Sequence, residues 1–487
     1  MNFSACWAER AAAAVLLGLL TLGAHGAAPS PCRIDGVPHE ALCGTLTRPL
    51  DAAREGGTQI ELHYAVLPAL ARNKKPDPVF FLAGGPGQSA IDLAGTVSRL
   101  LSRFGQRRDI VLVDQRGTGR SAPLDCGDEP PARPLSEQLD PQRQLQRARD
   151  CLRKLQALPH GDLRHYGTTA AMADLDAVRQ ALGAERINLV GVSYGTRAAL
   201  EYLRLYPQHV RRVVLDGVAP PDMALPEASA PDAQAAFDAL LQSCAQDAAC
   251  RSQHPRLQQA WQTLLASLPH TVTVAHPLTG RDETLRLTRD MVLGMVRAAL
   301  YAPTTASALP AALDAAAQGR FAPLLGLASA LAPARRQAAL AQGMHFSVVC
   351  TEDLPGTAVQ EPAADFGEGL APLYREVCAF WPRGELAAGF RQIPPAPVAT
   401  LLLSGGIDPA TPPRHGERVA QALGAKARHA VVPNAGHGLL TLPCVRDAVF
   451  RFVDAADDEQ ALRVDADCAR DIPRPPAFVP PVTGAAP

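Results

Sequence analysis

Residues 187–195 read Ile-Asn-Leu-Val-Gly-Val-Ser-Tyr-Gly, an apolar β-rich run that ends in a Gly-x-Ser-x-Gly turn with Ser193 at its apex. This feature constrains the fold most, because such a tight turn leaves no room for a Cβ at Gly191 or Gly195. The pattern is that of a nucleophile elbow, which holds a serine hydroxyl above the end of a strand. We therefore expect a strand before Ser193 and a helix after it.

The flanking segments decide how much weight the motif carries, because a bare Gly-x-Ser-x-Gly arises often by chance. Upstream, apolar residues recur at helical spacing, Thr168 and Thr169 are candidate helix caps, and Gly183 is a candidate stop. Downstream, residues 198–206 favour a helix that Pro207 ends. Both flanks agree with an elbow.

Two later loops supply an acid and a base in the chain order expected after such a serine. Residues 399–403 form an apolar run before Asp408, and residues 429–432 form another before His437, which glycines flank. We predict a triad of Ser193, Asp408 and His437. In it His437 takes the serine proton, while Asp408 fixes the imidazole tautomer and stabilises the imidazolium.

Each member of this set also has a simpler interpretation. The chain has 13 histidines, and one taken alone is more often a surface or core residue than a base. Chain order and loop context are what favour His437. An earlier candidate acid, Asp216, follows the short apolar run 213–215, but a turn residue at the end of a strand explains it more simply.

A glycine-rich loop follows the apolar run 79–82, with residues 83–88 reading Ala-Gly-Gly-Pro-Gly-Gln. Missing side chains leave backbone N–H groups free to face a developing alkoxide, so the N–H of Gly85, or alternatively Gly84, would form an oxyanion hole with that of Tyr194. The competing interpretation is a phosphate-binding loop. It is disfavoured because the proline removes a donor and no Gly-Lys-Ser/Thr follows.

Together these motifs resemble a known family. Gly-Gly-Pro-Gly, the segment Asp-Gln-Arg-Gly-Thr-Gly-Arg-Ser at 114–121, the elbow and the late Asp and His are similar to the prolyl and tripeptidyl aminopeptidase branch of the α/β-hydrolases, over about residues 40 to 470. The resemblance implies an α/β fold: a mostly parallel central sheet flanked by helices, with a largely helical lid inserted before the acid-bearing strand. Prolyl enzymes usually carry a histidine where Ala83 stands, which favours the secreted, tripeptidyl-type group.

The same resemblance implies a site for the substrate amine. The family places an acidic residue two positions after a similar cysteine, which maps onto Glu352 after Cys350. A buried carboxylate there would pair strongly with an ammonium group. The alternative is that Glu352 and Asp353 are two solvated acids on a loop.

The expected activity is an exported serine exopeptidase that removes one to three residues from peptide N-termini through an acyl-enzyme. A carboxylesterase with the same triad is the first alternative, and a non-catalytic binding protein on the same fold is the second. Three intact site residues argue against the second alternative. Peptides are the expected partners, and the sequence does not indicate an oligomeric state.

The chain has 487 residues and 47% hydrophobic content, enough for a large core and more than a minimal domain of this kind needs. Its middle is alanine-rich and mostly helical in pattern, for example at 235–244 and 291–300, with a hairpin-like piece at 271–287. The expected divisions are a signal peptide at 1–26, a first core part at 27–220, a lid at 221–394, a second core part at 395–470 and a Pro-rich tail at 471–487.

Two features indicate export to the periplasm or the extracellular space. Arg10 precedes the apolar run 11–22, which is too short to span a bilayer, and small residues follow near Gly26. Of 11 cysteines, Cys6 lies in that segment, and the even number left suggests disulfides. Pairing sequence neighbours gives one economical guess: Cys32 with Cys43, Cys126 with Cys151, Cys244 with Cys250, Cys350 with Cys378, and Cys444 with Cys468.

Charge and cysteine spacing exclude several classes of partner. The formal net charge is −1 and aromatic residues make up 5%, so neither nucleic acid nor an anionic membrane surface is expected to bind. Cysteine pairs with two intervening residues, typical of zinc sites, are absent from the sequence. We expect no metal and no cofactor.

Overall fold

The computed structural model describes most of the chain. The expected signal peptide at 1–26 and residues 479–487 of the expected tail lie outside the described part. None of the described helices combines the length and the apolar composition needed to cross a bilayer. The described residues are 28–127, 133–138, 140–276, 278–330, 340–354 and 362–478.

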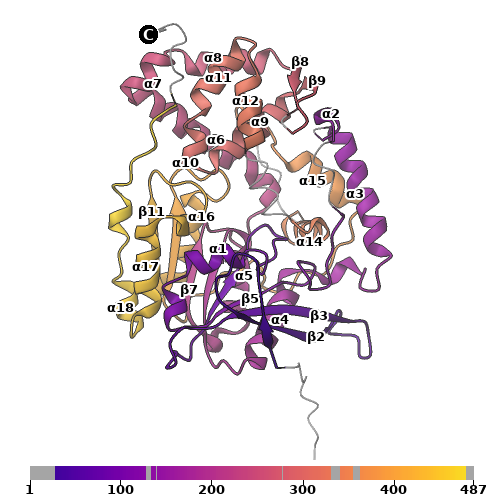
Figure 1. Ribbon diagram of the computed structural model, residues 1–487, viewed down its shortest axis with the longest axis vertical. Coiled ribbons are helices and arrows are strands. Elements are labelled where there is room, and N and C mark those ends of the chain that lie inside the picture. The colour runs from indigo at the N-terminus through magenta and orange to yellow at the C-terminus, as the bar shows by residue number, and fades with distance from the viewer. Residues whose placement is uncertain are drawn as a thin grey trace, which may run out of the picture.

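A nine-stranded mixed sheet forms the centre of the molecule (Figure 1). The first three strands pair antiparallel, and the other six run parallel to one another. This confirms the predicted α/β class with a mostly parallel sheet. In spatial order the strands are β1 (Ser30–Cys32), β2 (Ala41–Pro49), β3 (Gln59–Leu67), β5 (Ile110–Val113), β4 (Val79–Leu82), β6 (Ile187–Val192), β7 (Val210–Asp216), β10 (Thr400–Gly405) and β11 (Ala427–Val432).

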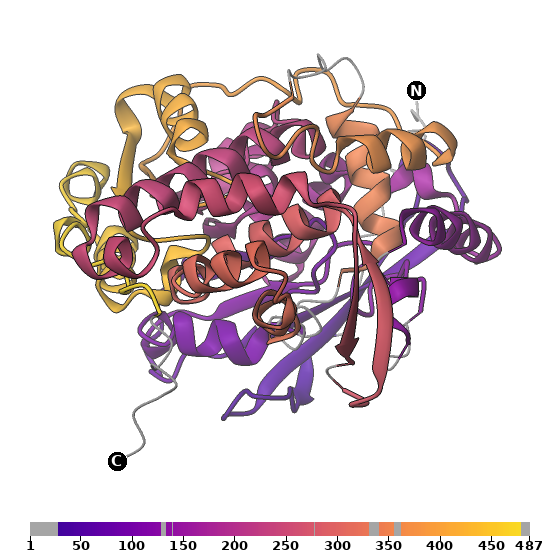
Figure 2. The same cartoon turned by 90° about the horizontal axis from the view of Figure 1, so that it is seen from above.

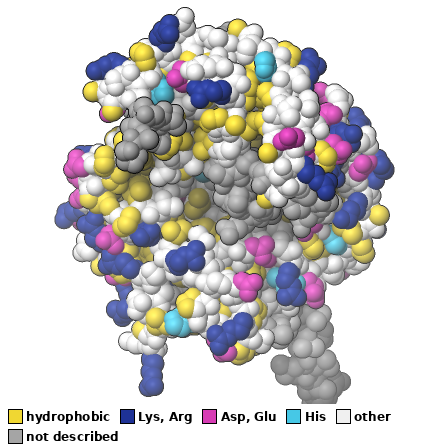
Figure 3. Space-filling view, turned by 45° about the horizontal axis from the view of Figure 1, so that its top comes forward, with side chains coloured by type: hydrophobic (Ala, Val, Ile, Leu, Met, Phe, Trp, Pro, Cys, Tyr) yellow, Lys and Arg dark blue, Asp and Glu magenta, His cyan; other side chains and the backbone are white. Residues whose placement is uncertain are grey.

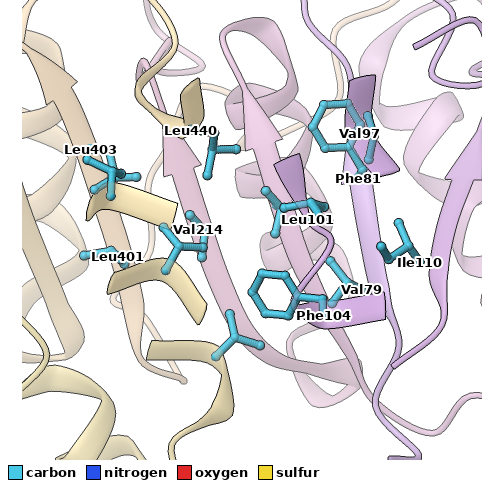
Figure 4. Close-up of a cluster of buried hydrophobic side chains, with 14 of the residues drawn as sticks. Val79, Phe81, Val97, Leu101, Phe104, Ile110, Val214, Leu401, Leu403 and Leu440 are labelled. Carbon is cyan, nitrogen blue, oxygen red and sulfur yellow. The ribbon is translucent and has the colours of Figure 1, made fainter. Parts of the chain in front are cut away.

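Helices cover both faces of the sheet. Alternate residues of each strand point to opposite faces, and here both sets are apolar and need to be buried. Val79 and Phe81 pack in one buried cluster, shown in Figure 4, and Phe80 and Leu82 pack in another on the opposite face. The covering helices are α1 (Ala94–Leu100), α17 (Pro443–Asp454) and α18 (Asp458–Leu462) on the first face, and α4 (Thr168–Ala181), α5 (Tyr194–Leu205) and α16 (Pro413–Leu423) on the second.

The chain between β7 and β10 forms a group of helices with a core of its own, which overlies the sheet when seen from above (Figure 2). In that core the rings of Phe237 and Trp261 lie 4.7 Å apart. We call this segment the lid. Its elements are α6 (Leu225–Gln246), α7 (Ala248–Gln253), α8 (Leu257–Ala266), β8 (His270–Ala275), β9 (Asp282–Leu287), α9 (Arg289–Leu300), α10 (Pro303–Ala306), α11 (Leu309–Ala317), α12 (Ala322–Ala330), α14 (Gln342–Val348), a π-helical turn (Val349–Asp353) and α15 (Ala371–Phe380).

The elements predicted inside the lid are confirmed. The helical pattern at 235–244 lies within α6, and the pattern at 291–300 lies within α9. The expected hairpin is the antiparallel pair β8 and β9, and Gly280 occupies its turn with a φ of +68°. A left-handed residue there is what glycine supplies at low cost.

A second segment, which was predicted to belong to the first core part at 27–220, packs on the lid. Helices α2 (Leu135–Gln138) and α3 (Pro141–Gln156) follow β5 and pack on the lid: Cys151 and Leu155 of α3 share a buried cluster with α14 and α15. At α2, the Leu135 N–H donates to Glu283 of β9 over 2.7 Å. The cover over the sheet is therefore built from two separate stretches of chain.

Five disulfides stabilise these parts. They join the same neighbours that the economical guess paired, and one of them links the π-helical turn to α15. Disulfides of this number are consistent with an exported protein. The pairs are Cys32–Cys43, Cys126–Cys151, Cys244–Cys250, Cys350–Cys378 and Cys444–Cys468.

Candidate active site

Ser193 lies between the last residue of β6 and the first residue of α5, with φ +56° and ψ −123°. Such a conformation is strained for a residue with a side chain, and strained positions cluster at functional sites. A Cβ on Gly191 would collide with the Gly195 carbonyl, and one on Gly195 would collide with the Leu82 carbonyl. The predicted need for glycine on both sides of the serine is thus confirmed.

Asp408 and His437 lie in the loops after β10 and β11. These strands are parallel neighbours in the sheet, so their following loops meet at one edge. The His437 Nδ1 and Asp408 Oδ2 atoms are 2.8 Å apart. The structure thus brings together two residues that are well separated in sequence, in a geometry that suits a base and its orienting acid.

The hydrogen bonds around Asp408 define its charge state. Burial alone would raise its pKa, but His437 and the donors of Thr411 outweigh burial and lower the pKa to about 2. The donors are the Ala410 and Thr411 N–H groups at 2.8 and 3.0 Å and the Thr411 hydroxyl at 2.7 Å. An ionised acceptor at Asp408 keeps the proton of neutral His437 on Nδ1 and leaves Nε2 able to accept one.

His437 lies over the strand that neighbours the elbow. The Ser193 N–H donates to the Asp216 carbonyl over 2.9 Å, and a Cβ on the next residue, Gly217, would lie 3.2 Å from His437 Cε1. Within the described residues no hydrogen bond joins Ser193 Oγ to the imidazole. Contacts of this kind are often long without substrate and tighten when substrate binds.

Asp216, the alternative acid, has a different set of contacts. Its carboxylate is fully buried and accepts hydrogen bonds from the Leu439 and Leu440 N–H groups, at 2.8 and 2.9 Å. Burial raises its pKa to about 6. Asp216 therefore anchors the loop that follows His437, while Asp408 makes the hydrogen bond to the ring.

The glycine-rich loop after β4 lies beside the nucleophile. A Cβ on Gly84 would lie 3.2 Å from the Ser193 Cβ, and Gly85 has a φ of +110°. Neither the Gly85 N–H nor the Tyr194 N–H has a hydrogen-bond acceptor among the described residues. Two unpaired donors next to a serine are the requirement for an oxyanion hole.

The lid fastens this loop from outside. The Ala341 N–H donates to the Gly87 carbonyl over 2.9 Å, and His345 Nδ1 lies 2.9 Å from the Pro86 carbonyl oxygen. His345 Nε2 is 2.7 Å from the Tyr374 hydroxyl of α15. These contacts could not be predicted from the sequence, because no residue near the loop in sequence supplies them.

Glu352 lies buried in the π-helical turn, so the alternative of a solvated loop acid does not describe it. Its oxygens accept from the Thr168 N–H at 2.6 Å and from the Thr168 hydroxyl at 2.8 Å. Burial raises its pKa to about 7, against the opposing effects of Arg197 and Thr168. The adjacent Asp353 pairs with Arg197, whose Nη1 is 2.5 Å from Asp353 Oδ1 and 3.7 Å from Glu352 Oε2.

This arrangement corrects the predicted helix cap. Gly167, rather than Thr168 or Thr169, is the N-cap of α4, and its missing side chain leaves the first N–H to Glu352. The carboxylate also suits the positive end of the helix. The cap is therefore long-range: it comes from the lid, far away in sequence.

A hydrogen-bond chain connects Glu352 to the residue after the nucleophile. The Tyr194 hydroxyl lies 2.7 Å from the Thr168 hydroxyl, which in turn donates to Glu352. The Tyr194 side chain is buried, and its hydroxyl reaches Glu352 through Thr168, while its backbone directly follows Ser193. Tyr194 thus links the nucleophile elbow to Glu352.

No group of three or more His, Cys, Asp or Glu side chains in the described part of the chain is arranged to hold a metal ion. Lys and Arg side chains are scattered over the face shown in Figure 3 and do not gather in one cluster.

Comparison with known proteins adds a family match and several relatives. A family model described as alpha/beta hydrolase fold matches residues 77–441. The serine protease Hip1 of Mycobacterium tuberculosis is 28% identical over 440 residues, 81% of this chain and 82% of the relative. The tripeptidyl aminopeptidase of Streptomyces lividans is 33% identical over 202 residues, 39% of this chain and 38% of the relative. Carboxylesterase B of Mycobacterium tuberculosis is 29% identical over 422 residues, 79% of this chain and 78% of the relative.

Proposed function

This chain belongs to the α/β-hydrolase family, and we propose that it is an exported serine exopeptidase that removes one to three residues from free peptide N-termini. The broader assignment, a serine hydrolase, follows from the family and from relatives named as a serine protease and a tripeptidyl aminopeptidase. The expected signal peptide and the five disulfides support export.

In the proposed mechanism, Ser193 Oγ attacks the scissile carbonyl carbon while His437 Nε2 takes the hydroxyl proton. The negative oxygen faces the N–H groups of Tyr194 and of Gly85 or its neighbour Gly84. His437 then gives the proton to the leaving nitrogen, the C–N bond breaks, and an ester to Ser193 remains. A water molecule repeats the sequence and releases the N-terminal fragment, with Asp408 stabilising the imidazolium in both halves.

The buried charge beside the nucleophile carries the aminopeptidase proposal. Glu352 and Asp353 are two carboxylates, and Arg197 is the guanidinium that forms ion pairs with them, while Arg391 donates to the Glu352 carbonyl. The charge of Arg391 also acts on Asp353, yet burial outweighs the nearby cation and raises the pKa of Glu352 to about 7. A substrate ammonium beside Glu352 would stabilise its charged form, and each carboxylate oxygen can accept a further hydrogen bond.

The lid gives a reason for exopeptidase action. We propose that residues 221–394, joined by α2 and α3, cover the carboxyl ends of the strands and exclude chain beyond the substrate N-terminus. The contacts between the lid and the glycine-rich loop at 83–88 support this position. A covered site of this kind also keeps water away from the charged contacts that bind substrate.

A carboxylesterase is the second candidate, because the relatives include an enzyme named carboxylesterase B over most of this chain. The two candidates differ in what they require from the substrate. An esterase would accept neutral esters and gain nothing from a free amine, so Glu352 would serve only as the cap of α4.

Mass spectrometry of one peptide with a free and with an acetylated N-terminus separates these candidates. We expect the oxidised mature protein to shorten only the free peptide, and the mass lost counts the residues released per cleavage. Hydrolysis of a short-chain ester with neither peptide cut would establish the esterase instead. A Ser193→Ala sample run in parallel controls for contaminating peptidases.

Glu352→Gln tests the amine site. The amide keeps the size of the side chain and can still accept from the Thr168 N–H, but it removes the negative charge. We expect KM for free-amine peptides to rise about 10- to 100-fold, the range of a hydrogen bond to a charged group. KM for a neutral ester should change far less.

The matched control is Glu227→Gln. Glu227 is also a buried lid carboxylate, but it pairs with Arg375 in the lid, 2.9 Å away, so the control removes a structural charge of the same kind. Equal effects of Glu352→Gln on peptide and ester substrates would remove the proposed role of Glu352 and leave only its helix cap.

A further inference from the structure

A cation of the lid lies beside the proposed base. Arg297 is in α9, and its guanidinium carbon lies 5.3 Å from the centre of the Tyr301 ring. Tyr301 in turn contacts His437: their rings meet edge to face at 5.2 Å, and the His437 N–H donates to the Tyr301 carbonyl over 2.9 Å. A short chain of contacts therefore connects Arg297 to the site.

The charge of Arg297 also reaches the site. Burial and Arg297 both act to lower the pKa of His437, although Asp408 outweighs them and the net shift is upward. The charge of Arg297 also acts on Tyr374: burial raises the pKa of the Tyr374 hydroxyl, and Arg297 opposes that rise. Arg297 thus lies within electrostatic reach of both the proposed base and the lid helix α15.

Arg297 differs from Arg289 and Arg375 of the lid because its guanidinium has no hydrogen bond or ion pair among the described residues. Arg289 of the same helix donates to the Asp365 carbonyl over 2.9 Å, and Arg375 pairs with two glutamates. The Arg297 Nε atom, by contrast, is buried and has no hydrogen-bond acceptor in the described structure. A buried donor without a partner is costly, so an anion bound there would complete the site.

The proposed mechanism fixes which part of a substrate lies near Arg297. Residues before the scissile bond extend from the oxyanion hole toward Tyr194 and Glu352. His437 protonates the leaving nitrogen, so residues after the bond lie on the His437 side. Tyr301 contacts His437 and Arg297 lies near the Tyr301 ring, so we infer that both border that side.

Resting on the proposed function, we propose that Arg297 forms a subsite for a carboxylate on the leaving group. The planar guanidinium matches a carboxylate with two parallel hydrogen bonds. Two sources supply the same chemistry: the side chain of Asp or Glu directly after the scissile bond, or the C-terminal carboxylate when a single residue leaves. The enzyme would then prefer acidic leaving groups to neutral ones of the same size.

The test uses matched peptides that share one N-terminal sequence. The first pair carries Glu or Gln directly after the cleaved bond, in longer peptides with amidated C-termini. The second pair ends at that position with Gln, as a free acid or as an amide. For each pair, the kcat/KM of the acidic member is divided by that of the neutral member, at a pH where His437 is neutral.

We expect the wild-type ratio to exceed unity by about tenfold for at least one pair, and Arg297→Gln to bring it close to one. Arg297→Lys should retain part of the preference, and Arg297→Glu should invert it toward a peptide with Lys at that position. Arg289→Gln is the matched control, because Arg289 lies about 12 Å away along the same helix at 1.5 Å per residue. Its ratio should equal that of the wild type.

The outcomes separate this inference from the function on which it rests. If the wild-type protein cleaves none of the peptides, the exopeptidase proposal fails. If it cleaves them without preferring either acid, or if Arg297→Gln keeps the preference, Arg297 is not a carboxylate subsite and the exopeptidase proposal stands. If Arg297→Gln abolishes the preference for the acidic peptide in only one of the two pairs, that pair identifies which carboxylate Arg297 binds.

Discussion

Ser193→Ala is expected to reduce kcat/KM for every substrate by about 10⁴- to 10⁶-fold, the range found when a serine nucleophile is removed. The reason is that covalent catalysis has no other nucleophile at the elbow. Stability should be unchanged, because the Ser193 side chain makes no hydrogen bond within the described residues and alanine meets the same backbone strain. The measurements are steady-state kinetics with purified protein and the midpoint of thermal unfolding.

Ser98→Ala provides the matched control for this variant. Ser98 lies on α1, and within the described part of the chain its hydroxyl donates only to the Gly95 carbonyl of its own helix, over 3.0 Å, so this variant also deletes one hydroxyl. Full activity is expected there. Ser193→Ala protein that unfolds at the wild-type temperature and retains activity near wild type would reject the nucleophile assignment.

Much of the fold was predictable because its signals are local. The apolar runs at 79–82 and 187–192 correspond to β4 and β6, and the strand expected at 399–403 is β10, shifted by one residue at its start and extended by two. Parallel strands covered on both faces are continuously apolar, and the turns that follow them need glycine or proline. Loops at the strand ends then receive the polar residues, which is why chain order and loop context together could select Asp408 and His437 as candidates.

The contacts that shape the site were less predictable, because they join distant segments. Thr168 has the local pattern of a helix cap, yet Glu352 supplies the cap from the lid. In the same way, the sequence around Pro86 does not indicate that His345 contacts the Pro86 carbonyl. Such pairs form only once the lid is placed on the sheet, and no local propensity or periodicity encodes that placement.

The lid segment at 340–353 makes both of these long-range contacts. Its start holds the glycine-rich loop after β4 through Ala341 and His345, and its end carries Glu352 and Asp353. Cys350 ties the same segment to α15 through its disulfide. The lid therefore contacts the candidate site rather than only covering it, and we expect a change in this segment to alter both the proposed oxyanion hole and the proposed amine site.

Asp408→Asn is expected to lower kcat by about 10⁴-fold with little change in fold, as a neutral amide in this position favours the wrong imidazole tautomer. The amide NH₂ group would face His437 Nδ1 and move the imidazole proton to Nε2, where the serine proton must be accepted. A second effect has a definite sign. Asp408 raises the pKa of His437, so its loss should lower that pKa and move the acid limb of the kcat/KM profile to lower pH.

Asp216→Asn distinguishes this role from general loss of a buried charge. Asp216 also raises the pKa of His437, but its carboxylate bonds to the Leu439 and Leu440 N–H groups instead of the ring. One amide oxygen can replace only part of that anchor, so we expect a lower unfolding temperature and a much smaller loss of kcat than for Asp408→Asn. A larger loss at Asp216 than at Asp408, in variants that remain folded, would reassign the triad acid to Asp216.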